Sequence, residues 1–83
     1  MSNSHIDVTF DLAVFNHDRQ IDLRIPTRLS VKQLLIEVVE TLKLETPKNM
    51  RCAIKVKTKE ILILDDDMLI DYPITDGDIL TVL

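Results

Sequence analysis

Glycine and cysteine are scarce in this chain, which has one of each, Gly77 and Cys52, among 83 residues. A single glycine excludes the glycine-rich loops that cradle nucleotide phosphates. A single cysteine cannot form an internal disulfide, which fits a reducing compartment, and we expect the cytoplasm. Even with the two histidines, His5 and His17, it cannot complete a typical zinc site unless carboxylates join. We therefore expect no cofactor and no metal.

Long apolar runs are also missing. No stretch approaches the ~20 apolar residues that span a bilayer, so we expect no direct membrane insertion. The first ten residues lack the basic and apolar regions of a secretion signal. Acidic residues outnumber basic ones by 14 to 10, giving a net charge of −4. This balance argues against general nucleic-acid binding, which depends on neutralising phosphates.

In the first half of the chain the spacing of apolar residues changes once, from every second position to every third or fourth. Residues 5–13 and 20–25 alternate between apolar and polar side chains, and a polar turn signal at 16–18 separates them, which predicts a β-hairpin. Ser30 is a good helix N-cap, and the apolar residues after it recur every three or four positions, which predicts an amphipathic helix ending near Lys43. The predicted helical stripe comprises Val31, Leu34, Leu35, Val38 and Leu42.

The second half returns to strand patterns, at residues 52–57, 61–64 and 79–83. In the last strand Leu80 and Val82 are predicted to face the core. The order β-β-α-β-β-β describes one α+β domain over residues 1–83. A mixed sheet of four to five strands would carry one main helix packed across one face, leaving the other face in water. This arrangement is a β-grasp.

The face of the predicted sheet that is exposed to water carries the one feature for which we weigh a functional role against a purely structural one. We find no Ser-His-Asp arrangement and no paired-carboxylate cleft, so we do not expect an enzyme. Basic and apolar side chains are predicted together on the open face, and such a patch can dock a protein partner. The other interpretation is that the lysines only keep an exposed face soluble. The candidate docking residues are Ala53, Lys55, Lys57, Ile79, Thr81 and Leu83.

Four strings in this chain carry a resemblance to a known family. They are VTFDL from Val8, DLRIP from Asp22, IKVKTK from Ile54 and LIDYPITDGDILTVL from Leu69. In this order they resemble the YukD/EsaB family, small ubiquitin-like proteins of Gram-positive bacteria associated with type VII (WXG100/ESX-type) secretion. The resemblance implies a ubiquitin-like β-grasp and a cytoplasmic accessory or regulatory protein whose partners belong to the secretion machinery.

Two further functions remain as alternatives. A protein modifier or sulfur carrier of this fold needs a terminal Gly-Gly, whereas this sequence ends at Leu83 and has its only glycine before the last strand, so we expect no conjugation. A self-associating protein is the other alternative, because an exposed sheet edge or the apolar end at Leu83 could form a homodimer. In ubiquitin an exposed isoleucine on the third strand belongs to the recognition patch. Lys55 holds that position here, so ubiquitin-type partners should bind poorly.

Overall fold

The computed structural model of the protein describes residues 5–15, 20–46, 48 and 51–83. The predicted turn at 16–18, with His17, lies outside these residues. In the described part the chain forms five strands, one α-helix and two short 3-10 turns. These are β1 (His5–Asp11), η1 (Ala13–Phe15), β2 (Gln20–Pro26), α1 (Val31–Leu42), β3 (Ile54–Val56), β4 (Ile61–Ile63), η2 (Leu69–Asp71) and β5 (Ile79–Val82).

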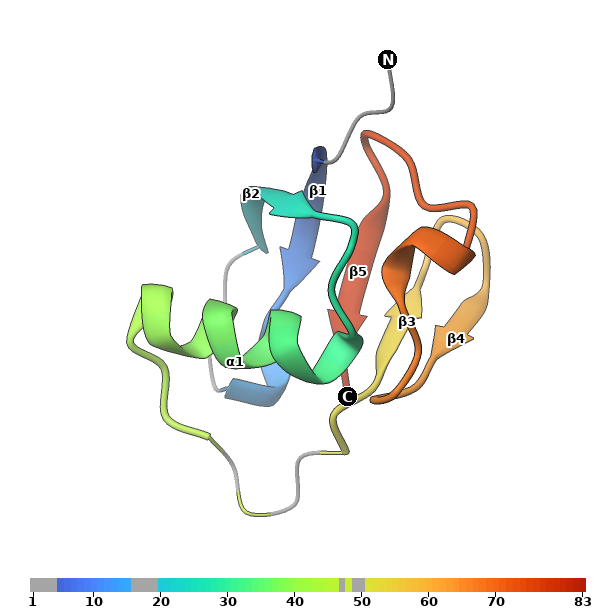
Figure 1. Ribbon diagram of the computed structural model, residues 1–83. Helices are drawn as coiled ribbons and strands as arrows, with labels where there is room; N and C mark the ends of the chain where they lie inside the picture. Colours follow the sequence, from blue (N-terminus) through green and yellow to red (C-terminus); the bar gives the residue numbers. More distant parts are fainter. Residues whose placement is uncertain (1–4, 16–19, 47, 49–50) are drawn as a thin grey trace.

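The five strands form one mixed sheet in the order β2-β1-β5-β3-β4. β5 pairs in parallel with β1 and antiparallel with β3, and the two hairpins β1–β2 and β3–β4 are antiparallel. The helix α1 crosses one face of this sheet (Figure 1). The α+β β-grasp predicted from the sequence is therefore confirmed. Within the described residues, no helix is both long and apolar enough to cross a membrane.

Helix α1 begins and ends at residues that cap its free backbone groups. The Ser30 hydroxyl accepts a hydrogen bond from the Gln33 amide at 3.2 Å, which satisfies one of the free amides of the first turn. At the other end Lys43 has a left-handed backbone with φ 53°, and its amide donates to the Glu40 and Val39 carbonyls. The apolar stripe of α1 is buried against the sheet, as predicted, except that Leu42 is only partly buried.

The core lies between α1 and the inward side of the sheet. Phe10, Ile54 and Leu80 have no exposed surface, and Val82 has 2%. Because side chains alternate along a strand, the inward position of Leu80 and Val82 places their neighbours in β5 on the other face. The central strand β5 therefore contributes side chains both to the core and to the open face.

An ion pair between buried Asp78 and partly buried Lys59 fixes the segment that leads into β5. Asp78 is only 5% exposed, and its carboxylate accepts hydrogen bonds from Lys59 Nζ at 2.7 Å, Thr58 Oγ1 at 2.6 Å and the Thr75 amide at 2.8 Å. Lys59 Nζ also donates to Thr75 Oγ1 at 3.0 Å and to the Pro73 carbonyl. The turn between β3 and β4 is thereby tied to the loop that precedes β5.

Replacing Asp78 with asparagine should destabilise the domain by about 2 kcal/mol, because the buried carboxylate that accepts charged hydrogen bonds from partly exposed Lys59 would be lost. Urea unfolding measures this difference. Asp66→Asn is the control, since Asp66 is exposed and the same loss of charge there should change stability by less than about 0.5 kcal/mol. Equal effects of the two variants would contradict a stabilising role for the Asp78 ion pair.

The same carboxyl should make stability depend on pH. Burial by itself raises the pKa of Asp78, but the hydrogen bonds from Lys59, Thr58 and the Thr75 amide outweigh it and leave the pKa below its ordinary value. A lowered folded-state pKa stabilises the fold above the unfolded-state pKa, and this contribution disappears as the pH falls through the folded-state value. The stability difference between wild type and Asp78→Asn should therefore be constant near neutral pH and shrink below about pH 4. Urea unfolding across that range measures it, and a difference that grows toward acid pH would contradict the assignment.

Candidate functional site

The open face of the sheet has a row of polar side chains that crosses β5. Thr81 is the register partner of Lys55 on β3 and of Asp11 on β1. Directly paired residues of neighbouring strands point to the same side of a sheet, so these three side chains share the open face. Ile79 lies next along β5 on the same face and pairs with Thr9. The structure therefore places Lys55, Ile79 and Thr81 on one face, and their docking role stays a prediction.

Ala53 does not belong to this surface. It is only 4% exposed, so its predicted place among the docking residues is wrong. The prediction assumed that side chains alternate between inward and outward from Cys52 onward. However, Cys52 has a left-handed backbone with φ 51°, and β3 begins only at Ile54. The Ala53 carbonyl accepts a hydrogen bond from the Leu83 amide at 2.9 Å, which holds Leu83, itself partly exposed, beside β3.

The two lysines of the face have different surroundings. Lys57 Nζ lies 3.0 Å from Asp11 Oδ2, and because β5 separates β1 from β3, this ion pair passes over β5. The hydrogen bond from Lys57, helped by one from the Ala13 amide, holds the pKa of Asp11 below its ordinary value. The Lys55 side chain is exposed and has no ion-pair or hydrogen-bond partner among the described residues. Lys55 is therefore the lysine of this pair that is free to meet a partner.

Thr81 contributes an unsatisfied hydroxyl. Its Oγ1 atom is buried, and no described residue gives it a hydrogen bond. A buried polar atom without a partner costs about 1–3 kcal/mol, so native proteins contain few of them. This oxygen lies in the same row as the free ammonium of Lys55.

Two exposed leucines enlarge the face beyond the predicted residues. Leu62 in β4 is the register partner of Lys55 and is 54% exposed, and Leu64 two residues later is 52% exposed. Neither was among the residues predicted for the site. The run from Ile61 to Leu64 is apolar throughout, so it gives no alternation, but pairing with the clear pattern of β3 could have placed Leu62 outward.

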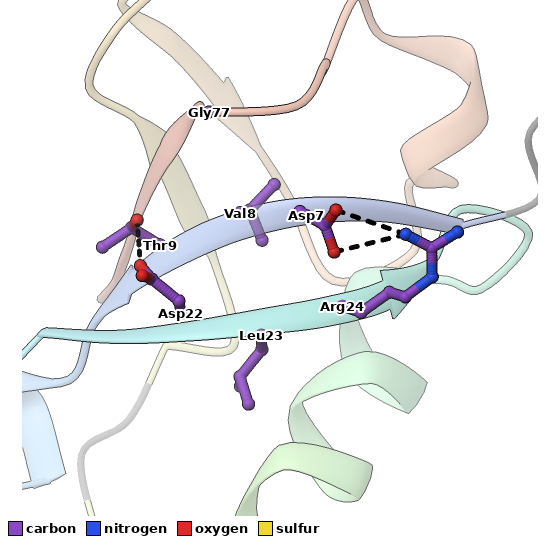
Figure 2. A pocket seen from close by; sticks show the side chains of 7 residues that line it. All are labelled: Asp7, Val8, Thr9, Asp22, Leu23, Arg24 and Gly77. Atoms are coloured by element: carbon purple, nitrogen blue, oxygen red, sulfur yellow. Dashed lines mark hydrogen bonds and ion pairs between the residues drawn. The ribbon is translucent and has the colours of Figure 1, made fainter.

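The opposite half of the face is polar and internally paired. A cavity of about 310 Å³ lies over β1 and β2 beside Gly77 (Figure 2). In it Arg24 forms an ion pair with Asp7 at 3.2 Å, and the Thr9 hydroxyl donates to Asp22 at 2.6 Å. Because these polar groups already satisfy one another, this half offers a partner fewer open groups than the half around Lys55.

A second cavity of about 310 Å³ lies beside α1. Its lining includes Ile36, which is 50% exposed, and Cys52, which is partly buried and packs against the core. Within the described part of the chain, no three histidine, cysteine, aspartate or glutamate residues gather closely enough to hold a metal ion. Cys52 has no other metal-binding side chain in this lining except Glu40.

Comparison with known proteins identifies close relatives. Residues 5–82 match the family model described as WXG100 protein secretion system (Wss), protein YukD. The type VII secretion system accessory factor EsaB of Staphylococcus aureus, strains Newman and COL, is 41% identical to this chain over 81 residues. That alignment covers 98% of this chain and 99% of the relative.

Solved structures agree on the fold. A structure described as molecular mimicry of SUMO that promotes DNA repair superposes with a TM-score of 0.71 at 16% identity, covering 100% of this chain and 95% of that one. The ubiquitin of Caldiarchaeum subterraneum gives a TM-score of 0.62 at 20% identity, covering 95% of this chain and 94% of that one. At these identities the likeness establishes a ubiquitin-like fold and nothing more.

Replacing Thr81 with valine should raise the free energy of unfolding by about 1 kcal/mol, since valine keeps the shape and removes a buried hydroxyl that has no partner. Thr9→Val is the matched control. It removes the hydrogen bond to Asp22, so it should leave stability unchanged or lower it by up to about 1 kcal/mol. Chemical denaturation of both variants measures this, and a loss of stability in Thr81→Val would show that the hydroxyl is satisfied.

Proposed function

This chain belongs to the YukD family of the WXG100 protein secretion system, and we propose that it is a non-catalytic accessory protein of type VII secretion. It acts on the cytoplasmic side, by non-covalent docking of the open sheet face on a protein of the secretion machinery. The match to an EsaB relative over almost the full length of both chains is the observation that carries the proposal.

The character of the open face supports docking. Two exposed leucines and the partly exposed Ile79 share the face with a free lysine. Protein interfaces likewise combine an apolar centre with charges that orient the partner. Lys55, Lys57, Ile79, Thr81 and Leu83 remain the proposed docking residues, and we add Leu62 and Leu64 to them. We call these seven residues the docking face.

Two observations support a mechanism without catalysis or conjugation. The polar groups of the cavity over β1 and β2 are engaged in pairs with one another, such as Arg24 with Asp7, and none is set apart as a nucleophile or base. Leu83 is held on the sheet by backbone hydrogen bonds with Ala53 and Arg51, so this residue does not extend away from the domain. An unchanged intact mass of the protein purified from its native cell would agree with this mechanism, whereas a covalent adduct would contradict it.

The exposed leucines of β4 favour self-association as a second candidate function. β4 is an edge strand, and Leu62 and Leu64 leave it without the charged side chains that usually discourage edge pairing. Light scattering over a range of concentrations decides between the two. A constant monomer mass would remove this candidate, and a mass that rises toward a dimer would support it.

The double variant Lys55→Glu/Lys57→Glu should abolish complementation of secretion in a strain that lacks the wild-type protein, because charge reversal repels a partner that the lysines attract. Secretion of WXG100 proteins into the medium measures the effect. The control is Lys32→Glu/Lys48→Glu, which changes the same charge at two exposed lysines outside the docking face. Normal secretion by the docking-face variant, folded and expressed like the control, would contradict the proposal.

A further inference from the structure

We propose that the docking face recognises a carboxylate side chain flanked by apolar side chains on a partner protein, and that Lys55 is the residue that binds it. This inference rests on the proposed function, because it names the chemistry of the partner at the same face.

The lysine at the centre of the face is suited to an anionic acceptor. The Lys55 ammonium has three hydrogen-bond donors and no acceptor, and it has no ion-pair or hydrogen-bond partner among the described residues. Its register partner Thr81 supplies no donor to an incoming group, because the Thr81 hydroxyl oxygen is buried. A carboxylate accepts several hydrogen bonds through its two oxygens and carries the opposite charge to lysine, so it satisfies the Lys55 ammonium.

The surroundings favour a protein carboxylate over a phosphate. Leu62 lies directly across from Lys55 in the sheet, and Ile79 and Leu83 flank Thr81 along β5. Apolar neighbours bury the aliphatic parts of a peptide, whereas phosphate sites gather several cationic or backbone donors. Within the described part of the face, Lys57 is the second cation, and it is already paired with Asp11. One free cation in an apolar setting matches one carboxylate.

The Lys57–Asp11 ion pair limits where the carboxylate can bind. This pair passes over β5 beside Thr81, so the accessible side of the row is the side of Lys55 and Leu62. Lys57 donates to Asp11 and holds it in place, and this keeps the acidic side chain of Asp11 from repelling the incoming carboxylate. We therefore place the bound carboxylate over β3, between β5 and the exposed leucines of β4.

The test is an NMR titration of the isotope-labelled full chain with short synthetic peptides. The first probe alternates leucine and aspartate, the second has asparagine in place of every aspartate, and the third has phosphoserine there. The aspartate peptide should shift the amide signals of Lys55, Leu62 and Thr81, and the asparagine peptide should bind about tenfold more weakly, as expected for loss of a charged hydrogen bond. Equal or tighter binding of the asparagine or phosphoserine peptide would overturn the carboxylate assignment.

One substitution tests the binding residue. Lys55→Gln should weaken binding of the aspartate peptide by about tenfold and remove its preference over the asparagine peptide. Lys32→Gln, which changes an exposed lysine on α1, should leave binding unchanged. Unaltered binding by Lys55→Gln would overturn the inference.

A further variant separates this inference from the proposed function. Leu62→Ser tests the apolar part of the face without altering its charge. If Leu62→Ser weakens binding and Lys55→Gln does not, the docking face stands and the carboxylate recognition is wrong. If the peptide shifts signals around Ile36 and leaves the docking face unchanged, both the inference and the docking face are wrong.

Discussion

The position of β5 between β1 and β3 is the constraint on which the rest of the structure depends. Its parallel pairing with β1 and antiparallel pairing with β3 join two hairpins that are otherwise distant in sequence. The ion pair of buried Asp78 with partly buried Lys59 fixes the chain just before this strand. On one side β5 supplies Leu80 and Val82 to the core, and on the other it supplies Ile79 and Thr81 to the open face. The four residues of β5 therefore contribute both to the core and to the proposed docking face.

The open face divides into a half whose groups satisfy one another and a half whose groups do not. Over β1 and β2, charges are paired across the hairpin, and this part of the surface resembles an ordinary hydrated sheet. Over β3, β4 and β5, a free ammonium, a buried hydroxyl without a partner and two half-exposed leucines lie together. The exposed leucines leave apolar surface in water, and a bound protein would cover them while its carboxylate pairs with the ammonium. That asymmetry is the physical reason for assigning the docking role to one half.

Much of the fold could be predicted from the sequence, because it depends on patterns among residues that are close together in the chain. Ser30 caps the helix through its own hydroxyl. In β1, β2 and β5 the alternation of apolar and polar residues indicates which side chains face the core. The site was harder to predict because it depends on contacts between distant residues. The pairing of Lys57 with Asp11 requires the strand order β1-β5-β3, which brings together residues 46 positions apart. Ala53 was misplaced because the left-handed backbone of Cys52 interrupts an alternation that looks continuous in the sequence.

Site-specific photocrosslinking in the native cell tests the docking account most directly. A photoreactive amino acid would replace Leu62 on the docking face or Ile36 on α1, because these two side chains are similarly exposed, at 54% and 50%, and belong to opposite layers of the fold. Crosslinks are expected from position 62 to a component of the secretion machinery, and none to that component from position 36. Crosslinks to the machinery from position 36 alone would place the docking surface on the helix and contradict docking through the open sheet face.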